Sequence, residues 1–337
     1  MGSIFSRNFR AMIQDTFGRL HDYMRISLTD ACNFRCFYCM PDEEVEVTPH
    51  NKLMSSEEIF RMASAFVEMG VKKIRLTGGE PLVRKDFAQI VTLLASLPVR
   101  LTLTSNGVLL HKYKDLLWEA GVRSINISLD TLDPVRFFAL TKRDHFNQVK
   151  RNIDTFLEAG FHVKVNVVVM KGINDEELRS FVEWTRNEAI HIRFIEFMPF
   201  DRNQWHAHRV FTLEEILSEI SKSFYFTKIA DEKNDTCKKY QCVHHAGTFA
   251  IISTMSHPFC ATCNRLRLTA DGKLKNCLFS KNETDLLTAM RKNESITELI
   301  LANVKSKAEA LGGQLLHDFY KLNPSELQNR SMIAIGG

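Results

Sequence analysis

Short apolar runs alternate with amphipathic stretches along residues 25–196, and this alternation limits the fold more than any other feature of the sequence. The runs predict strands at 25–29, 73–77, 100–104, 124–128, 164–169 and 191–195. The stretches between them predict helices at 56–69, 86–96, 113–120, 146–159 and 175–187. Several of these helices end at a glycine, which suits a left-handed C-cap: Gly70, Gly121 and Gly160. Successive βα units of this kind predict an α/β protein built on a partial (β/α)6 TIM-like barrel.

The alternation ends after Met198 and Pro199, so we place a domain boundary near residue 200. The remainder predicts a helix at 213–223, a charged loop at 231–239, a strand at 248–253, a cysteine-bearing hairpin and further helices. We therefore expect an N-terminal arm at 1–20, the barrel at 21–200, a smaller C-terminal domain at 201–322 and a tail at 323–337. The arm should be frayed, and the polar tail should be mobile unless another part of the protein holds it.

Composition excludes several classes of protein. The 337 residues carry 44 Lys and Arg against 40 Asp and Glu, and the net charge of +4 is too small to indicate a non-specific nucleic-acid binder. No stretch reaches the ~20 apolar residues of a membrane span, and no apolar run typical of a secretory signal is visible, so we expect a cytoplasmic protein. Because the cytosol keeps thiols reduced, the eight cysteines indicate metal binding or catalysis. Two of them, Cys237 and Cys242, have no third ligand beside them and are expected to be bystanders.

Three cysteines lie close together immediately after the first expected strand. Cys32, Cys36 and Cys39 have the spacing C-x3-C-x2-C. A loop this short can supply three corners of a [4Fe–4S] cluster and no fourth, which leaves one iron open to a non-protein ligand. Structural zinc is the alternative, but it usually needs four ligands, and His50 lies eleven residues past Cys39.

The second expected strand ends in Thr77-Gly78-Gly79-Glu80-Pro81. We expect the paired glycines to remove side chains where the backbone approaches a ligand beside the cysteine loop. Alone, this sequence is also typical of an ordinary turn between a strand and a loop. In parallel α/β folds reactive groups gather at the carboxyl ends of strands. The polar residues at those ends are Thr29, Thr77, Thr104, Ser128 and Glu196.

A second group of cysteines, Cys260, Cys263 and Cys277, has the spacing C-x2-C-x13-C. It again offers three ligands, and it suits a second three-cysteine iron–sulfur site with an open iron. A zinc site completed by His257 is the alternative.

The C-x3-C-x2-C loop followed by the Gly-Gly-Glu strand end resembles the radical S-adenosylmethionine (SAM) enzymes over the whole barrel half. Four features narrow the resemblance to the GTP 3′,8-cyclases of molybdenum-cofactor biosynthesis. They are residues 32–41, the strand and turn at 74–84, the Cys-x2-Cys-x-Arg-x-Arg segment with a later Asp-Gly and Cys, and the final Gly-Gly. The resemblance implies a lyase that makes 3′,8-cyclo-7,8-dihydro-GTP in the first step of molybdenum cofactor (molybdopterin) biosynthesis.

The same resemblance implies two [4Fe–4S] clusters and SAM as cofactors. The first cluster, on Cys32, Cys36 and Cys39, would bind SAM and yield a 5′-deoxyadenosyl radical that takes a hydrogen from C3′ of GTP. The second, on Cys260, Cys263 and Cys277, would hold the purine. The implied partners are cyclic pyranopterin monophosphate synthase downstream and a flavodoxin- or ferredoxin-type electron donor. A homodimer is left open, and neither a membrane nor a nucleic acid is implied.

Motif by motif, the resemblance also implies individual contacts. The SAM contacts are Tyr38, Gly79, Ser128 and Met198, and the GTP contacts are Arg25, Arg75, Thr104, Lys164, Arg265 and Arg267, with Lys73 and Arg193 in second rank. Charges embedded in apolar strands are costly without a partner, which is a physical reason to expect an anion there. The terminal Gly336 and Gly337 are expected to reach into the active-site cavity, where only glycines leave the backbone slim enough.

Other functions remain as alternatives. The runner-up is another two-cluster radical SAM enzyme acting on a peptide or sulfatase substrate, and such an enzyme would be expected to carry more auxiliary cysteines. A ferredoxin-like electron carrier would need four protein ligands for each cluster, and a zinc-binding adaptor would need neither an open site nor a barrel. The three-ligand spacing argues against both.

Overall fold

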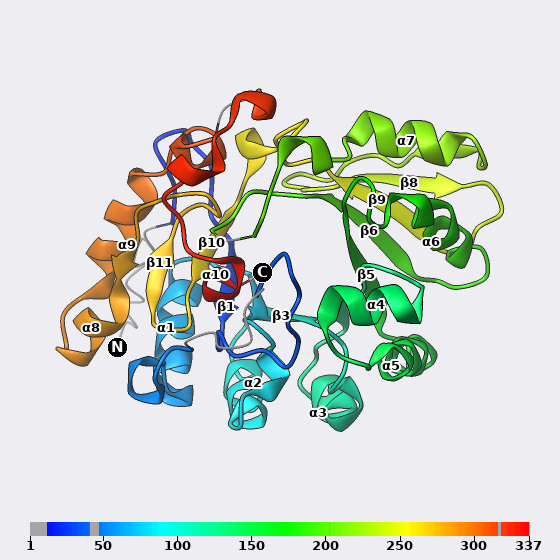
Figure 1. Cartoon of the computed structure of the whole chain (residues 1–337). Coiled ribbons are helices and arrows are strands. Elements are labelled where there is room, and N and C mark those ends of the chain that lie inside the picture. Colours follow the sequence, from blue (N-terminus) through cyan, green and yellow to red (C-terminus); the bar gives the residue numbers. More distant parts are fainter. Residues whose placement is uncertain (1–11, 41–46, 202, 316–317, 337) are drawn as a thin grey trace, which may run out of the picture.

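A curved parallel sheet forms the centre of the molecule (Figure 1). The structure is a computed structural model that describes residues 12–40, 47–201, 203–315 and 318–336. The parallel strands are β1 (Tyr23–Ser27), β2 (Lys73–Thr77), β3 (Arg100–Ser105), β4 (Ser124–Ser128), β5 (His162–Val169) and β6 (His191–Glu196), and neighbours in this order are hydrogen-bonded. Each of them overlaps its predicted range, so the prediction of a partial (β/α)6 barrel is confirmed.

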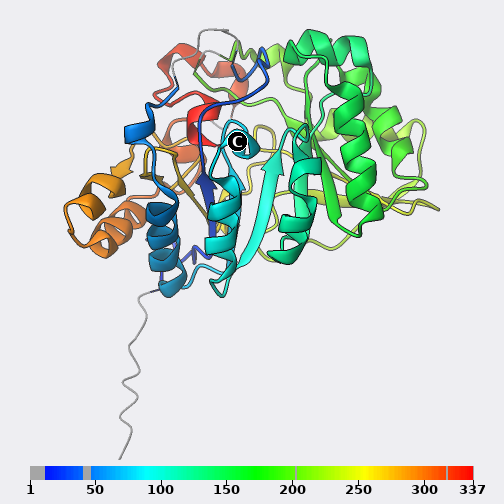
Figure 2. The same ribbon diagram turned by 90° about the horizontal axis from the view of Figure 1, so that it is seen from below.

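Helices cover the outer side of these strands (Figure 2). They are α1 (Ser56–Glu68), α2 (Phe87–Ala95), α3 (Lys114–Glu119), α4 (Pro134–Thr141), α5 (Phe146–Glu158) and α6 (Leu178–Trp184). α1 begins with a capping box in which Ser55 and Glu58 satisfy each other's backbone N–H groups. Gly70, Gly121 and Gly160 follow their helices with positive φ, as predicted. The sequence prediction missed α4 entirely.

The chain beyond residue 200 continues the same sheet at both of its edges. β9 (Thr248–Ile252) pairs parallel with β6, and β8 (Lys238–Cys242) and β7 (Phe226–Lys228) follow it. At the other edge β10 (Arg265–Leu268) pairs parallel with β1, and β11 (Lys273–Lys275) and β12 (Thr284–Asp285) follow antiparallel. The last residues of the predicted loop at 231–239 therefore belong to β8. The sequence pattern did not show this strand because it is defined by pairing with distant residues. The domain boundary near residue 200 stays a prediction.

Two apolar clusters make up the core. The larger one fills the space between the sheet and the surrounding helices and includes residues from the C-terminal helices α7 (Leu213–Ser221), α8 (Leu286–Arg291) and α9 (Ile296–Lys305). The smaller one gathers aromatic residues after β6, among them Phe197, Phe200 and Trp205, against Phe279 and Ile335. Within the described part of the chain, no helix is both long and apolar enough to cross a membrane.

Both ends of the described chain are docked. Residues 12–22 are held by buried Asp15, which accepts hydrogen bonds from the backbone and side chain of Arg19. At the other end, α10 (Met332–Ile335) buries Ile333 and Ile335 (Figure 1). The expectation of a frayed arm is therefore wrong for residues 12–20, because buried polar contacts hold them, and the tail as far as Gly336 is held by the protein. Residues 1–11 and Gly337 lie outside the described residues.

Candidate active site

A band of cationic side chains crosses the inner face of the sheet. In the parallel register Arg25 of β1 lies beside Arg267 of β10 on one side and Arg75 of β2 on the other. Partners in register project to the same face, so these three guanidinium groups share one surface. Further along the sheet, Lys164 of β5 and Arg193 of β6 also line this interior. The alternation of each strand thus turns its charged residues inward and its apolar residues toward the helices.

These cations line a cavity of about 1080 Å³. Its walls include seven of the eight predicted GTP contacts: Arg25, Lys73, Arg75, Lys164, Arg193, Arg265 and Arg267. Thr104 is not part of the lining, and its hydroxyl instead accepts a hydrogen bond from Arg75 Nη1 at 3.3 Å. The same cavity is lined by all three cysteines of the second group. The sequence-predicted cations and the second cysteine group therefore meet in one place.

Burial makes these cations costly in the absence of an anion. It lowers the pKa of Lys164 to about 8, with Arg193 and Arg75 adding repulsion. Burial also lowers the pKa values of Arg25 and Arg193 to about 10, and neighbouring Arg75 contributes to both shifts. Arg193 Nε is buried and has no hydrogen-bond partner in the described structure. A bound polyanion would relieve this repulsion, so the electrostatics fit a phosphate-bearing ligand.

The first cysteine loop lies between the end of β1 and the end of α4. Arg35 N donates to Thr141 O at 2.9 Å, and Phe37 N donates to Leu140 O at 3.2 Å. Inside the loop, the N–H groups of Cys39 and Met40 both donate to Cys36 O. The helix that the sequence prediction missed is therefore one of the elements that support this loop.

The three thiols of this loop are partly buried, and their surroundings raise their pKa values. Burial, with a contribution from Glu80, raises the pKa of Cys32 to about 11. Burial and the neighbouring thiol of Cys39 raise the pKa of Cys36 well above its usual value. Such thiols ionise only beside a strong positive charge, which iron can supply. These residues fit an iron–sulfur cluster.

Single-ion sites fit the cysteines less well. Within the described ranges, no three His, Cys, Asp or Glu side chains converge closely enough to hold one metal ion. A cubane spreads its thiolates over different irons, so it does not require such convergence. His257, the residue that could complete a zinc site, instead faces Glu214 at 3.3 Å. The described geometry thus gives no support to a single zinc ion, and a cluster at the second group stays a prediction.

The Gly-Gly-Glu turn packs against the backbone that leads into the first cysteine loop. A Cβ on Gly79 would lie 2.4 Å from Ala31 O, and one on Gly78 would lie 2.5 Å from Thr29 O. Gly79 N donates to Thr29 O at 2.7 Å, and Glu80 N donates to Ala31 O at 2.9 Å. The glycines thus also make room for the backbone that leads into Cys32, and their approach to a ligand stays a prediction. A SAM contact at Gly79 stays a prediction.

Glu80 is a buried residue that the sequence analysis did not single out. Its carboxylate accepts hydrogen bonds from Leu82 N, Ser105 Oγ and Asn106 N, at 3.0, 2.9 and 2.6 Å. Burial nevertheless raises its pKa to about 7. The carboxylate joins the ends of β2 and β3, and Asn106 in turn donates to Asn33 in the cysteine loop at 2.7 Å. The acidic residue after two glycines was the signal that could have identified it.

The predicted SAM contacts lie at the same end of the barrel, on different elements. The Tyr38 hydroxyl donates to buried Asp130, which also accepts from Val168 N at 2.8 Å. Ser128 ends β4, in register with Asn166 of β5. Met198 lines the cavity and packs in the same apolar cluster as Tyr38. Their roles in binding SAM remain predictions.

The second cysteine group has a more cationic setting than the first. Lys307, which is 4% exposed, places Nζ 3.6 Å from Cys263 Sγ. Burial alone would raise the pKa of Cys263, but the charges of Arg265 and Lys307 outweigh it and lower the pKa to about 6. The Cys260 sulfur accepts from Leu311 N at 3.3 Å. Cys263 is therefore prepared for the thiolate form that metal binding requires, whereas burial raises the pKa of Cys260.

The N-terminal arm supports this second group from outside the cavity. Arg19 donates to Cys260 O at 2.8 Å, to Glu309 O at 2.6 Å and to Ala308 O at 2.9 Å. Asp15 pairs with Arg19 and also lies 3.1 Å from His21 Nε2. One buried guanidinium thus ties the Cys260 turn to the segment after α9. Nothing in the local sequence around Arg19 indicated this contact.

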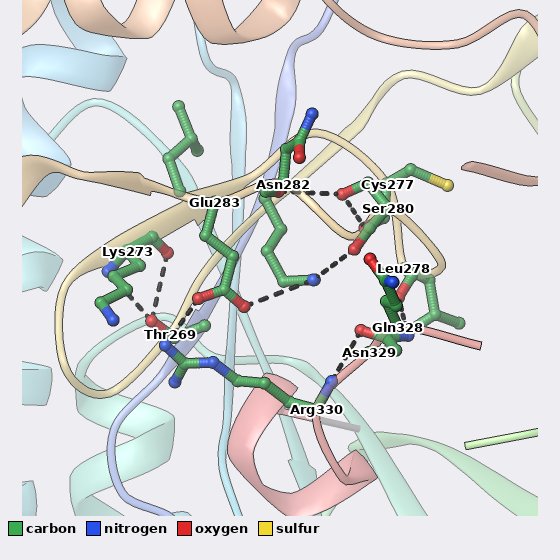
Figure 3. A network of polar contacts seen from close by, with 12 residues as sticks. Thr269, Lys273, Cys277, Leu278, Ser280, Asn282, Glu283, Gln328, Asn329 and Arg330 are labelled. Atoms are coloured by element: carbon green, nitrogen blue, oxygen red, sulfur yellow. Dashed lines mark hydrogen bonds and ion pairs between the residues drawn. The ribbon is translucent and has the colours of Figure 1, made fainter. Parts of the chain in front are cut away.

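A polar network fixes the turn that carries Cys277 (Figure 3). Arg330 reaches from the tail to Asp271 through two bonds of 3.0 Å and to Glu283 at 2.6 Å. Asn329 donates to Leu278 O at 3.0 Å, directly after Cys277. The tail and the second cysteine group therefore stabilise each other.

The tail then enters the barrel end. Arg267 Nη1 donates to Gly336 O at 2.6 Å. A Cβ on Gly336 would lie 2.9 Å from Ser27 Cβ and 3.1 Å from Thr77 Cγ2, and its φ is +83°. Ser27 and Thr77 end β1 and β2, so Gly336 lies at the carboxyl ends of the strands, and its entry into the active-site cavity stays a prediction. Gly337 is outside the described residues.

The two cysteines regarded as bystanders differ from each other. Cys242 is buried in the larger apolar cluster. Cys237 lines the cavity, and although burial raises its pKa, the charge of Arg193 acts in the opposite direction. These surroundings do not indicate a role as a metal ligand for Cys237 or for Cys242.

Comparisons with known proteins agree with this geometry. The sequence matches the Radical SAM superfamily over residues 26–185 and the family described as Molybdenum Cofactor Synthesis C over residues 190–312. It is 46% identical to "GTP 3',8-cyclase, mitochondrial" of Arabidopsis thaliana, over 97% of this chain and 84% of the relative. It is 40% identical to "GTP 3',8-cyclase" of Thermodesulfovibrio yellowstonii, over 89% of this chain and 95% of the relative.

Other relatives are longer, and similar solved structures are more distant. The chain is 41% identical to human "Molybdenum cofactor biosynthesis protein 1" over 97% of this chain, but it spans only 51% of that relative. Among solved structures, Streptococcus suis SuiB bound to S-adenosylmethionine matches with a TM-score of 0.56 and 16% identity, over 86% of this chain and 69% of that chain. At that identity the likeness shows a shared fold.

Proposed function

Because this chain belongs to the GTP 3′,8-cyclase family of radical SAM enzymes, we propose that it converts GTP to 3′,8-cyclo-7,8-dihydro-GTP, using SAM and two [4Fe–4S] clusters. The observation that carries the proposal is the cavity of about 1080 Å³ in which buried strand cations and a three-cysteine group face the same space. Its volume lies slightly above the roughly 300–1,000 Å³ of ordinary small-molecule sites. A nucleoside triphosphate offers phosphates to the strand cations and a base to the three-cysteine group.

The cations would hold the triphosphate. Arg25, Arg75 and Arg267 lie side by side through the strand register, so they present several N–H donors to neighbouring phosphate oxygens. Lys164 and Arg193 approach from β5 and β6 on the same inner face. The strands hold the backbone of these residues rigidly, so binding energy is available to fix the position of the sugar.

The first cysteine loop would hold the cluster that binds SAM. When bound, that cluster would supply the one electron that cleaves SAM into methionine and a 5′-deoxyadenosyl radical, the species that would take the hydrogen from C3′ of GTP. Tyr38, Gly79, Ser128 and Met198 would contact SAM, with Asp130 fixing the orientation of Tyr38. The half-buried positions of Cys36 and Tyr38 would limit the access of water, which protects a reactive radical from side reactions.

The second cysteine group would hold the cluster that meets the purine. Lys307 and Arg265 favour the thiolate of Cys263, and Arg19 fixes the turn at Cys260. Gly336 would place the end of the chain beside the substrate, anchored by Arg267. Together these residues would set the distance between C3′ and the radical.

The remaining partners are proposed from the family alone. The product would pass to cyclic pyranopterin monophosphate synthase, and a flavodoxin- or ferredoxin-type protein would deliver electrons. Sedimentation velocity would measure whether the protein forms a homodimer. We propose a cytoplasmic location, which imaging of the tagged full-length protein tests, since the Arabidopsis relative is named mitochondrial.

Two triple variants test the proposal. In one, Cys32, Cys36 and Cys39 are changed to Ser, and in the other Cys260, Cys263 and Cys277 are changed to Ser. After anaerobic reconstitution, Mössbauer spectra and iron analysis should give about eight irons for the wild type and about four for each variant, because each cubane holds four. Each protein is then incubated with reductant, SAM and GTP, and products are identified by mass spectrometry.

The outcomes separate the two sites. The wild type should form 5′-deoxyadenosine and a cyclised GTP together. The first variant should form neither, and the second should still cleave SAM but leave GTP unchanged. Stoichiometric zinc in place of iron, or SAM cleavage by the wild type that is indifferent to GTP, would overturn the proposal and direct the search to a peptide substrate.

A further inference from the structure

Tyr23 is a cavity residue that the sequence comparison with the family did not single out. It opens β1, lies in register with Lys73 of β2 and Arg265 of β10, and lines the cavity. Its phenol oxygen accepts a hydrogen bond from Arg75 Nε at 2.6 Å. The ammonium group of Lys73 lies 4.3 Å from the centre of its ring. One side chain therefore contacts two neighbouring cations of β2 in two different ways.

The contact with Tyr23 fixes one edge of the Arg75 guanidinium. Nη1 of the same group donates to Leu103 O at 2.9 Å and to Thr104 Oγ1 at 3.3 Å. These bonds use Nε and Nη1, and Nη2 makes no hydrogen bond among the contacts described for residues 12–336 outside the gaps. Arg75 is thus held in a plane by its own protein while one nitrogen is kept for a ligand oxygen.

Tyr23 also offsets repulsion within the group of cations. Although burial raises the pKa of Tyr23, the charges of Arg75, Arg25 and Lys73 lower it to about 7. The pKa of Lys73 is lowered by burial, and the interaction with Tyr23 acts against that shift. The ring of Tyr23 contacts Lys73 and its oxygen contacts Arg75, which reduces the cost of holding these two positive charges close together.

We propose that Tyr23 is a positioning residue for the phosphate-binding cations, which holds Arg75 through its hydroxyl and Lys73 through its ring so that both face the triphosphate of the substrate. The inference rests on the proposed function only in naming GTP as that substrate. The contacts themselves predict binding of any triphosphate. Tyr23 would act through Arg75 and Lys73 and would have no part in the radical step.

Two variants separate the contacts, and a third is a control. Tyr23→Phe removes the bond to Arg75 and keeps the ring under Lys73, whereas Tyr23→Leu removes both. Tyr113→Phe removes a phenol hydroxyl beside Phe87, outside the cavity. Thermal unfolding of each variant verifies the fold. Equilibrium binding is measured anaerobically with GTP, inorganic triphosphate and guanosine.

The hydroxyl contributes a hydrogen bond to a charged group, so Tyr23→Phe should raise the Kd of GTP and of inorganic triphosphate roughly tenfold. Tyr23→Leu should raise it roughly threefold more, since a cation–π contact is also lost. Guanosine binding should be unchanged within about twofold in both. In turnover, Tyr23→Phe should raise KM for GTP roughly tenfold and leave kcat within about twofold.

Specific results would overturn the inference. Binding of triphosphate by Tyr23→Phe as tight as that of the wild type, or tighter, would show that the phenol competes with the ligand or does nothing for it. Equal losses for guanosine and triphosphate would show a general structural defect. If the wild type binds inorganic triphosphate but not GTP, the proposed substrate fails while the role of Tyr23 is still measured. If the wild type binds neither, both ideas fail.

Discussion

Replacement of Gly79 by Ala tests how the strand end controls the first cysteine loop. The added Cβ would lie 2.4 Å from Ala31 O and 2.6 Å from Asp30 O, and both neighbours are backbone atoms. Normal contact is about 3.5 Å, so the segment before Cys32 must move by roughly 1 Å. Overpacking of this kind costs about 1–3 kcal/mol, and weakening the bonds at Thr29 O and Ala31 O adds about 1 kcal/mol. We expect a loss of about 2–4 kcal/mol in the free energy of unfolding.

The more specific consequence concerns the cluster. Cys32 follows Ala31 directly, so the shift would move one of three thiols away from its place. We expect iron in the reconstituted protein to fall from about eight to about four per chain, with SAM binding lost and the second site retained. The assay combines iron analysis, Mössbauer spectroscopy and equilibrium binding of SAM.

Gly247→Ala is the matched control. Its Cβ would lie 2.2 Å from Ile190 O, again a backbone atom, but Gly247 precedes β9 at the opposite edge of the barrel. This variant should lose a similar free energy of unfolding and keep both clusters. If Gly79→Ala held its full complement of iron and bound SAM normally, the reasoning about the turn would be refuted.

Three further predictions follow from the same contacts. Arg19→Met removes three bonds to backbone oxygens around Cys260, so iron at the second site should fall while the first site is retained, as Mössbauer spectra can show. Lys164, whose pKa burial lowers to about 8, loses its charge as pH rises through that value, so kcat/KM for GTP should fall above pH 8, up to roughly tenfold, and Lys164→Arg should lack this component. Arg267→Met leaves Gly336 O without its donor, so steady-state kinetics should show a rise in KM and a fall in kcat. A rise in KM with unchanged kcat would contradict an anchoring role for the tail.

Local patterns explain what the sequence could predict of the fold. The six barrel strands were found because each is a short run rich in apolar, β-branched residues, and their ends fell close to the observed ones. α4 was missed because Val135 and Phe138 are exposed on it, which blurs its amphipathic pattern. Its start was nevertheless marked, because Asp133 caps the helix and Pro134 occupies its first turn.

Long-range pairing explains what the sequence could not predict. The cysteine spacings are local, so both groups were recognised, but the position of β10 beside β1 depends on contacts between distant residues. That pairing brings Arg267 beside Arg25, and it cannot be read from either segment alone. The contact of Gly79 with Ala31 was likewise invisible, since a glycine shows that space is needed and not what fills it.

The central claim is that this cavity brings C3′ of GTP to a SAM-derived radical. The most direct test is anaerobic incubation of the reconstituted, reduced protein with SAM and GTP deuterated at C3′, followed by mass analysis of the 5′-deoxyadenosine formed. The account predicts one deuterium in that product, in an amount that depends on GTP. Unlabelled 5′-deoxyadenosine formed at the same rate with or without GTP would contradict it.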